Sequence, residues 1–226
     1  MKLALIGFGK MGHAIAELAP DRGFQVVRRI DPKGGDAKSV SKDSLAGADV
    51  AVEFTMPESA PANIKAAIEA GCPVVVGTTG WYDKRAELEQ LTRSKKGALL
   101  VAPNFSIGVA AFMKIAESAA QVIKSAPSFE AHITETHHSA KKDAPSGTAA
   151  NLAQAAAREW GKDIPITSIR VGAVPGTHEL VFDGPFEQIR LVHEARDRRV
   201  FADGALLAAK WIIGKSGVFT MTDVLK

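Results

Sequence analysis

A regular alternation of strands and helices in the first hundred residues constrains the fold more than any other feature of this sequence. Apolar runs such as LALI and PVVVG are separated by segments such as APANIKAAIEA, in which apolar residues recur at helical spacing. The runs lack polar alternation, as expected where helices cover both faces of a sheet. We expect strands at 3–6, 24–30, 50–54, 73–77 and 98–102, and helices at 11–19, 60–70 and 82–95. This order predicts an α/β fold with a doubly wound parallel sheet.

The pattern changes in the second half of the chain. After an expected helix at 109–124, the segment FEAHITET places Phe129, Ala131 and Ile133 on one face of a strand. Two later segments show related alternation, 179–182 and 187–194. They predict a second, α+β domain with an open mixed sheet, mostly antiparallel, that has one covered face.

The C-terminal segment 202–225 returns to a strongly apolar, helical pattern. We expect this tail to pack back on the first domain. The domain prediction is therefore a discontinuous first domain, residues 1–105 with 200–226, and a second domain, residues 106–199.

Composition bounds the class of protein. With 226 residues, 46% of them hydrophobic, the chain is long enough to bury well-formed cores. A formal charge of +3, from 28 basic and 25 acidic residues that are spread along the chain, does not indicate nucleic-acid binding. The one cysteine, Cys72, cannot form an internal disulfide. We find no signal peptide and no apolar run of about eighteen residues, and so expect a cytoplasmic protein without a membrane span.

A glycine-rich turn, GFGKMG, joins the first expected strand to the first helix. Gly7 permits a tight turn, Gly9 leaves room for a pyrophosphate at the backbone, and Gly12 lets the helix lie close to the sheet. The alternative is a turn that is rich in glycine for packing alone. The strand before it and the helix after it favour a dinucleotide-binding turn, in which the free amides of the helix start face the phosphates.

Asp31 closes the second expected strand, at the position where an acidic residue accepts hydrogen bonds from the adenine ribose of a dinucleotide. A carboxylate there repels a 2′-phosphate, so NADH is favoured over NADPH. Arg28, Arg29 and Lys33 lie close in sequence and keep NADPH open, because they partly neutralise Asp31. The other interpretation of Asp31 is an ordinary acidic residue at a strand end.

Three further strand ends carry small, hydrogen-bonding residues, in EFTMPES, GTTGW and APNFSIG. Ligands of a doubly wound sheet bind outside the carboxyl ends of its strands. Gly77, Thr78 and Thr79 offer backbone and hydroxyl groups to a ribose or a nicotinamide. Asn104, with the carbonyl of Ala102, can hold a carboxamide. The alternative is that these segments are ordinary loops, where such residues are common.

The segment ETHHSAKKDAPSGTA (135–149) ends in a helix start. Pro145 precedes the helix and Ser146 is its expected cap, while Asp143 is assigned to the turn before the proline. Gly147 lacks a side chain where another group must approach the backbone. The amides of Gly147 and Thr148, the Thr148 hydroxyl and the helix dipole therefore predict a site for a carboxylate.

The same segment carries ionisable side chains just before the helix. Lys141 adds a charge suited to the same carboxylate or to proton donation, and His137 and His138 titrate near neutral pH. One alternative is a surface role for the histidines. Another is zinc binding with His132 or Glu135, but no paired-ligand spacing is completed, so no metal is predicted.

Taken together, these motifs resemble the dihydrodipicolinate reductase (4-hydroxy-tetrahydrodipicolinate reductase) family, nicotinamide-dependent enzymes of diaminopimelate and lysine synthesis. The pattern H-H-x-x-K-x-D-x-P-S-G-T occurs with GFGKMG, EFTMPE, GTTG and APNFSIG in family order, and GTHE and HEARDRRVFADGA are similar to later family segments. The resemblance extends almost end to end. It implies a Rossmann domain completed by the C-terminal tail, a central domain that binds substrate and forms a tetramer, and a cytoplasmic location.

The resemblance also implies residue roles. It makes His137 the proton donor and acceptor, Lys141 a further donor and His138 a substrate contact, with the carboxylate held by Gly147 and Thr148. Residues implied around the cofactor are Gly7, Phe8, Gly9, Lys10, Met11, Gly12, Asp31, Gly77, Thr78, Thr79, Ala102, Pro103, Asn104 and Phe105. The chain departs from the family pattern in two ways: the nucleotide loop is one residue shorter, and a proline follows Asp31 where many members have arginine.

We expect the substrate to be a cyclic imine dicarboxylate or its hydrated precursor, reduced by hydride from the nicotinamide while His137 supplies a proton. Lys141 and the helix start hold a carboxylate and orient the ring. Arg198, in RDRR, either neutralises the dianion or belongs to a solvated basic face. Two competing functions are another NAD-dependent dehydrogenase of this architecture and a non-enzymic NADH-sensing module. The anion and proton site at 135–149 argues against the second.

Overall fold

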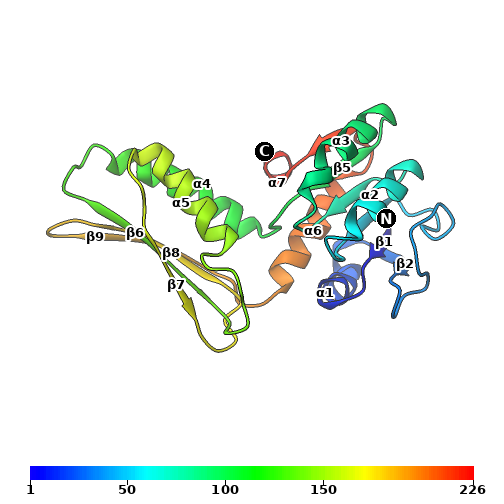
Figure 1. The fold of residues 1–226 in the computed structure, drawn as a ribbon, viewed down its shortest axis with the longest axis horizontal. Coiled ribbons are helices and arrows are strands. Elements are labelled where there is room, and N and C mark those ends of the chain that lie inside the picture. Colours follow the sequence, from blue (N-terminus) through cyan, green and yellow to red (C-terminus); the bar gives the residue numbers. More distant parts are fainter. The chain divides into compact units, whose positions relative to one another are not determined.

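The computed structural model describes all 226 residues, which fold into two compact units. Unit 1 comprises Met1–Ser106 and Arg199–Lys226, and unit 2 comprises Ile107–Arg198 (Figure 1). Unit 1 is therefore built from both ends of the chain. Which ligand each unit binds stays a prediction.

A six-stranded parallel sheet forms the centre of unit 1, in the order β10-β5-β4-β3-β1-β2. Its strands are β1 (Lys2–Ile6), β2 (Gln25–Ile30), β3 (Val50–Glu53), β4 (Val74–Val76), β5 (Ala98–Val101) and β10 (Gly217–Phe219). The predicted doubly wound parallel sheet is confirmed. Because β2 and β3 lie on opposite sides of β1, the loop after β1 is at the switch point of the strand order, where such sheets bind ligands.

Helices cover both faces of this sheet. They are α1 (Lys10–Leu18), α2 (Ala60–Glu69), α3 (Arg85–Ser94), α6 (Arg199–Ile212) and the short α7 (Met221–Val224), with 3₁₀ turns at Pro20–Arg22 and Tyr82–Lys84. Successive residues of a strand point to opposite faces. Leu3 and Leu5 accordingly pack in the core that contains α1 and α6, whereas Ala4 and Ile6 pack in the core that contains α2 and α3.

The expectation of one helix over 202–225 is wrong. Helix α6 ends at Ile212, and the chain then turns through Gly214, whose φ of 77° is a left-handed conformation that glycine adopts without strain. Strand β10 follows and pairs with β5 at the edge of the sheet. The apolar residues of this tail read alike as helix or strand, so periodicity could not locate the break.

Unit 2 contains a four-stranded sheet in the order β7-β6-β8-β9. Its strands are β6 (Glu130–His137), β7 (Ile166–Arg170), β8 (Thr177–Asp183) and β9 (Gln188–Glu194). Only β6 and β7 pair in parallel; β6 with β8 and β8 with β9 are antiparallel. The predicted mixed, mostly antiparallel sheet is confirmed. Strand β7 was not expected, because its short edge segment ITSIR has no fully buried residue to mark it.

Helices α4 (Ile107–Ile123) and α5 (Gly147–Trp160) lie side by side over one face of the unit 2 sheet (Figure 1). On β6, Ala131 and Ile133 point into this covered face, as the alternation predicts. The same period of two continues, so Glu135 and His137 are buried on the covered face as well. The apolar core thus ends, at the end of β6, in ionisable side chains.

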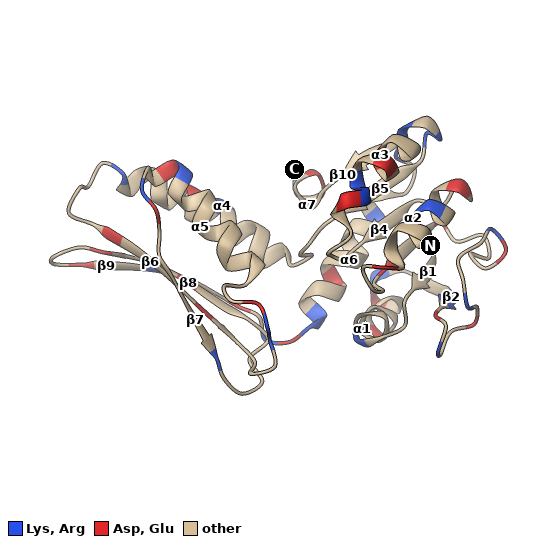
Figure 2. Cartoon of the chain, in the orientation of Figure 1, with Lys and Arg blue, Asp and Glu red and all other residues tan.

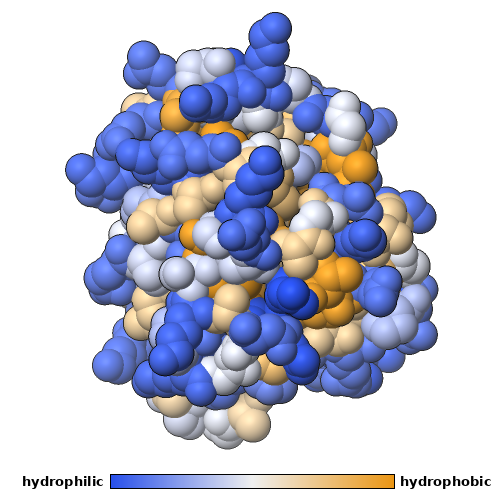
Figure 3. Space-filling view, turned by 90° about the vertical axis from the view of Figure 1, so that its right-hand side faces the viewer, coloured by the Kyte–Doolittle hydropathy of each residue, from blue (hydrophilic) through white to orange (hydrophobic).

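Charged residues are spread over both units. Figure 2 shows Lys and Arg interspersed with Asp and Glu along the chain, without a stripe of one sign. On the face drawn in Figure 3, hydrophilic residues surround small, separate hydrophobic areas. No helix has the length and apolar character needed to cross a bilayer.

Candidate functional site

The three glycines of the turn after β1 have different surroundings. Gly7 has a φ of 91°, and a Cβ there would overlap the carbonyl oxygen of Phe54. A Cβ on Gly12 would likewise overlap the Gly7 carbonyl. A Cβ on Gly9 would meet no atom within 4 Å, so packing inside the chain does not require glycine at this position. Gly7 and Gly12 therefore shape the turn, while Gly9 leaves its outer surface open, as a close approach by a ligand requires.

The start of α1 faces the same turn. Its N-cap is Gly9, which has no side chain to bond the free amides of the first turn. Lys10, the first helical residue, is exposed, and Phe8 and Met11 are half-buried against the core. Free amides with a nearby cation suit a diphosphate, so these residues fit the phosphates of a dinucleotide.

Asp31 anchors the glycine-rich turn to the end of β2. Its Oδ2 accepts a hydrogen bond from the amide of Phe8 and its Oδ1 accepts one from the amide of Lys33, each at 2.8 Å. The bond from Phe8, followed by that from Lys33, lowers the pKa of Asp31, so the carboxylate is ionised at neutral pH. A carboxylate has lone pairs for more than two donors, so Asp31 can still accept bonds from a ribose.

The residues of the segment after β4 differ in how far they are exposed to solvent. Gly77 is required by packing, because a Cβ there would overlap the ring of Phe54. Thr78 is buried and its hydroxyl accepts the amide of Thr55 at 2.7 Å, whereas Thr79 is exposed. The hydroxyl of Thr78 is thus used within unit 1, and Thr79 is the threonine that faces solvent.

The segment after β5 is fixed by a turn. Asn104 accepts the amide of Ser106 at 2.8 Å through its side-chain oxygen, and Pro103 is exposed. The side chains of Ala102 and Phe105 are buried, so a ligand would contact the backbone of these two residues more than their side chains. The Phe105 carbonyl lies against Gly204 of α6, where a Cβ would overlap it. The C-terminal tail therefore supports this segment directly.

Glu53, at the end of β3, is a buried acid that sequence reasoning missed. It is fully buried, accepts a hydrogen bond from the Thr55 hydroxyl and one from Asn63 at 3.5 Å, and its Oε2 has no partner. Burial raises the pKa of Glu53 above its ordinary value, against the hydrogen bonds, which lower it. The acid read from the sequence as the end of an apolar strand in fact organises the loop beside the glycine-rich turn.

We predict that Glu53→Gln becomes more stable relative to the wild type as pH rises. A carboxyl whose pKa is raised in the folded state binds its proton more tightly when the protein is folded. As pH rises from the ordinary pKa of 4.5 to the raised pKa, the unfolded state loses this proton first, and the wild type loses stability. Glutamine has no such loss. Urea unfolding at pH 5 and pH 8 measures the difference, and equal differences at both pH values would contradict the prediction. Glu89→Gln is the control with opposite sign, because Arg85 lowers the pKa of Glu89.

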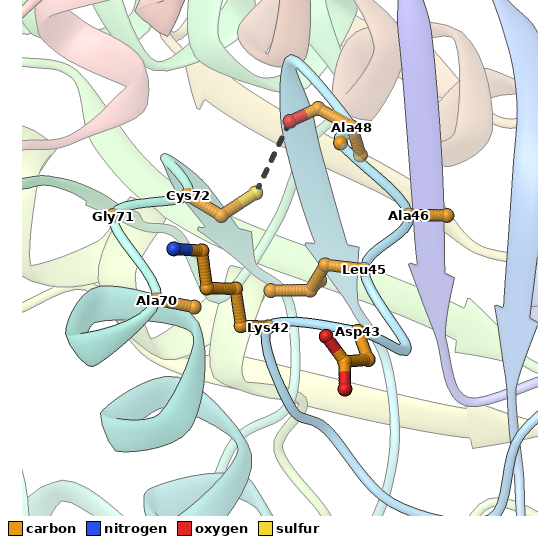
Figure 4. Close-up of a pocket in the computed structure, with 9 residues that line it drawn as sticks. Lys42, Asp43, Leu45, Ala46, Ala48, Ala70, Gly71 and Cys72 are labelled. Atoms are coloured by element: carbon orange, nitrogen blue, oxygen red, sulfur yellow. Dashed lines mark hydrogen bonds between the residues drawn. The ribbon is translucent and has the colours of Figure 1, made fainter.

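A cavity of about 420 Å³ in unit 1 lies away from these residues (Figure 4). Its lining precedes β3 and β4, so it is at the amino ends of the strands, opposite the glycine-rich turn. Cys72 points its thiol toward the carbonyl of Ala48, at 3.8 Å. Burial raises the pKa of this thiol to about 12, so it is not a nucleophile. The cavity is lined by Lys42, Asp43, Leu45, Ala46, Gly47, Ala48, Ala70, Gly71 and Cys72.

In unit 2, a hydrogen-bonded cluster forms where β6 meets the start of α5. Glu135 is bonded to Nδ1 of His137, accepts two bonds from the guanidinium of Arg170, at 2.7 and 3.0 Å, and accepts the amide of Ser146 at 3.2 Å. One buried carboxylate thus connects the imidazole that the sequence singled out to the helix start that it predicted.

The charge states within this cluster follow from its contacts. Burial alone would raise the pKa of Glu135, but the hydrogen bonds, that from Arg170 first, lower it to about 2. Burial lowers the pKa of His137, against the opposing effect of Glu135. Glu135 is therefore ionised throughout the neutral range, and His137 titrates below its ordinary value.

His178, on β8, is a second imidazole in the cluster. It lies edge-on to the ring of His137, with centroids 5.2 Å apart, and its Nε2 is 3.1 Å from the hydroxyl of Ser146. Burial, followed by the charge of His137, lowers the pKa of His178 to about 4, so this ring is neutral at pH 7. Gly176 lies beside both rings: it has a φ of 153°, and a Cβ there would lie 3.0 Å from Nε2 of His137 and 3.8 Å from Cε1 of His178.

The start of α5 is formed as predicted, with Ser146 as its cap. The Ser146 hydroxyl accepts the amide of Ala149 at 3.2 Å. Gly147 is exposed, and a Cβ there would meet no atom within 4 Å, so the fold does not require glycine at this position. Thr148 is half-buried beside it. The open backbone of Gly147 fits the expected approach of another group to the helix start.

The remaining predicted residues of unit 2 lie nearby in sequence but differ in contact. Lys141 forms an ion pair with Asp143, at 2.8 Å, so Asp143 holds the lysine instead of serving only the turn. His138 follows the end of β6 and is half-buried. Arg198 is exposed at the last position of unit 2.

Glu135, His137 and His178 also form a set of possible metal ligands, with atoms within 4.8 Å of one another. The hydrogen bonds argue against this use. Arg170 occupies both oxygens of Glu135 and places a positive charge where a cation would bind. The cluster is therefore better described as a carboxylate that organises an imidazole.

Sequence reasoning singled out His137 and gave Glu135 no role beyond a weighed zinc ligand. It did not consider Arg170, His178 or Gly176, which the structure places around these two residues. The alternation that places Ala131 and Ile133 in the core extends to Glu135, so this residue had a signal. The other three lie on β7 and β8 or just before β8, and their approach to His137 depends on strand pairing.

The fold and the site define a class: a nicotinamide-dependent oxidoreductase with a Rossmann-type unit and a second unit in which a buried imidazole lies near a helix start. Family models described as dihydrodipicolinate reductase, N-terminus and C-terminus, match residues 1–105 and 108–225. The chain belongs to the dihydrodipicolinate reductase family.

Similar proteins support the activity. The chain is 37% identical over 262 residues to the 4-hydroxy-tetrahydrodipicolinate reductase of Archaeoglobus fulgidus, with 100% of both chains covered. It is 35% identical over 237 residues to that of Christiangramia forsetii, covering 100% of this chain and 98% of the relative. The function is therefore 4-hydroxy-tetrahydrodipicolinate reductase, in diaminopimelate and lysine biosynthesis, and the two competing functions are set aside.

Solved structures agree on the fold. A dipicolinate-bound dihydrodipicolinate reductase from Paenisporosarcina sp. TG-14 has a TM-score of 0.80 at 24% identity, with 97% of each chain covered. A probable dehydrogenase from Thermotoga maritima has a TM-score of 0.62 at 10% identity, covering 99% of this chain and 92% of the other. The chain thus shares its fold with both of these proteins.

Proposed function

We propose that unit 1 binds NADH in preference to NADPH and that unit 2 holds a cyclic imine dicarboxylate, to which His137 supplies a proton. The dipicolinate named with the similar Paenisporosarcina protein is a planar ring dicarboxylate and supports this substrate class. The observation that carries the proposal is the contact of one carboxylate, Glu135, with both His137 and the amide of Ser146 at the start of α5. It holds a proton donor beside an anion site.

The chain's residues divide the work of the reaction. The amides of Gly147 and Thr148 and the Thr148 hydroxyl bind one carboxylate of the substrate, and Lys141, released from Asp143, binds the same group. His138 contacts the substrate, and Arg198 neutralises part of its charge. A bound reduced nicotinamide supplies the hydride. His137 gives a proton as negative charge develops toward the ring nitrogen, and regains it from solvent.

The cofactor site is proposed to consist of the turn after β1, Asp31 and the segments after β4 and β5. The preference for NADH is supported by the surroundings of Asp31. Arg29, one of the cations that favour NADPH, is paired with Asp36 at 3.2 Å. Less positive charge is therefore free to offset the repulsion between the Asp31 carboxylate and an approaching 2′-phosphate than the sequence suggests.

Asp31→Ser is expected to lower the ratio of kcat/KM for NADH to that for NADPH by about tenfold or more, because the repelling charge is removed. Serine keeps an acceptor for the amide of Phe8. Initial rates with each cofactor measure the ratio. Asp49→Ser is the matched control, since Asp49 also accepts a backbone amide, that of Lys2 at 2.6 Å, but at the amino ends of the strands, away from the glycine-rich turn. An unchanged ratio in Asp31→Ser would remove its role in cofactor choice.

The assembly state and location are also part of the proposal. The resemblance to the family supports a homotetramer formed through unit 2, and a cytoplasmic location. Light scattering during size-exclusion chromatography gives the mass of the assembly, and a monomer of 23.9 kDa would contradict it.

The whole proposal is tested by turnover. Freshly prepared 4-hydroxy-tetrahydrodipicolinate is added to the protein with NADH or NADPH, and the loss of absorbance of the reduced nicotinamide is followed for each. We expect rapid oxidation of NADH that depends on the substrate. Oxidation with NADPH alone would overturn the cofactor preference, and oxidation with neither would overturn the substrate.

A further inference from the structure

The carboxylate of Glu135 takes part in four hydrogen bonds. It is fully buried and is bonded to Arg170 through two nitrogens, to the amide of Ser146 and to Nδ1 of His137. Arg170 is itself fixed, because its Nη2 donates to the Asp143 carbonyl at 2.6 Å. A carboxylate with this many donors is both ionised and immobile.

The fixed carboxylate determines which nitrogen of His137 carries a proton. An ionised carboxylate only accepts hydrogen bonds, so the atom of His137 that faces it, Nδ1, must carry hydrogen. Nε2 is then the nitrogen that gains and loses a proton. Gly176 keeps this side of the ring clear, since any side chain there would begin 3.0 Å from Nε2.

The charged form of His137 depends on the same contact. Its surroundings are Glu135 on its own strand, Arg170 on β7, neutral His178 on β8 and Lys141 on the loop that follows. Burial and the charges of Lys141 and Arg170 oppose protonation of the ring, and Glu135 favours it. Glu135 is thus the group that makes an imidazolium attainable at this buried position.

We propose that Glu135, clamped by Arg170, is a positioning residue that directs Nε2 of His137 toward the substrate and sustains the charged ring from which the proton is given. The inference rests on the proposed role of His137. The N–H bond at Nε2 breaks, a bond from that proton to the substrate nitrogen forms, and the ring becomes neutral with its hydrogen on Nδ1. The reduced nicotinamide supplies the electron pair, and solvent restores the proton. Glu135 would thus act as the aspartate of a Ser-His-Asp triad does, by fixing the tautomer of the histidine and stabilising its charged form.

The test is Glu135→Gln, a change of similar shape that removes the charge. Because the imidazolium is the active form, activity is retained below its pKa and lost above it. Removing the favourable charge lowers this pKa, so the alkaline limb of kcat against pH moves to lower pH, by about one unit or more. We expect kcat to fall about tenfold or more at pH 8, less at pH 6, and NADH affinity to change less than twofold. Glu135→Asp keeps the charge on a shorter side chain, so its alkaline limb should lie between those of Glu135→Gln and the wild type.

A matched control exists on the opposite face of the same sheet. Glu179, on β8, forms an ion pair with Arg190, so Glu179→Gln also breaks a contact between a carboxylate and an arginine. It is expected to leave the pH profile unchanged. A fall in kcat that is equal at all pH values in Glu135→Gln would show a merely structural role and overturn the inference.

A second measurement separates this inference from the proposed function. In ¹⁵N NMR of the histidine-labelled full-length protein, which needs no turnover, neutral His137 should carry its proton on Nδ1, and Glu135→Gln should weaken this preference. The opposite tautomer in the wild type, or one equivalent of tightly bound zinc, overturns the inference even if His137 proves essential. Should Glu135→Gln not fold, Glu135→Asp provides a second readout. Its carboxylate still accepts but is one methylene shorter, so the contact with Nδ1 of His137 is weakened and the alkaline limb should move to lower pH. An unshifted limb in Glu135→Asp would overturn the inference.

Discussion

His137→Gln is expected to lower kcat by at least about 10²-fold, while binding of NADH persists. Glutamine has a similar reach and can keep a hydrogen bond to Glu135, but it cannot give up a proton. The side chain is buried on unit 2, whereas the glycine-rich turn and Asp31 belong to unit 1, so the cofactor residues are untouched. Steady-state rates with saturating substrate measure kcat, and the quenching of protein fluorescence on titration with NADH measures binding.

Lys141→Ala is expected to lower kcat/KM by a similar factor, because the substrate is held and oriented less well. A larger part of this loss should appear as a raised KM. The ion pair with Asp143 makes a useful comparison, since Asp143→Asn frees the lysine without removing it. Near-normal turnover in both His137→Gln and Lys141→Ala would remove these residues from the mechanism. Retained turnover in His137→Gln alone would transfer the proton donation to Lys141.

Gly204→Ala is expected to destabilise the protein by about 3 kcal/mol or more, although alanine favours a helix by about 1 kcal/mol over glycine. The added Cβ on α6 would overlap the carbonyl oxygen of Phe105. Backbone atoms on both sides must move, which costs more than the gain in helix propensity. Urea unfolding followed by far-UV circular dichroism measures the free energy of unfolding.

The same substitution should weaken NADH binding, because the displaced carbonyl belongs to the proposed cofactor segment after β5. Gly97→Ala is the control in unit 1: a Cβ there lies 3.5 Å from the side chain of Ile68, which is an ordinary contact. We expect it to change the free energy of unfolding by less than about 0.5 kcal/mol. Equal stabilities of Gly204→Ala and the wild type would show that α6 does not press on this segment.

The sheet of unit 1 was predictable because its signal is local. A buried parallel strand must be apolar on both sides, and Gly7 and Gly12 carry steric requirements that their own turn imposes. The tail was misread for the converse reason. Val218 and Phe219 suit either a helix or a strand, and the edge of β5 decides which one forms.

The candidate site divides in the same way. Ser146 was identified as a cap from its neighbours alone, and the structure confirms it. The proton role of His137 was implied by the resemblance to the family and stays a prediction. Arg170 reaches Glu135 from 35 residues away through the pairing of β6 with β7, and nothing in the segment ITSIR announces this contact. Glu53 was passed over because an acid at the end of an apolar strand has no local sign of burial.

By itself, the sequence determined the order of the elements, the turn shapes and the residue types that supply chemistry, since these follow from periodicity, capping and glycine sterics over a few neighbouring residues. Only the tertiary structure decided the partners and charge states of those residues. Burial and hydrogen bonds from distant strands set the pKa of an acid or an imidazole, and strand pairing alone brings Glu135, Arg170 and His178 around His137.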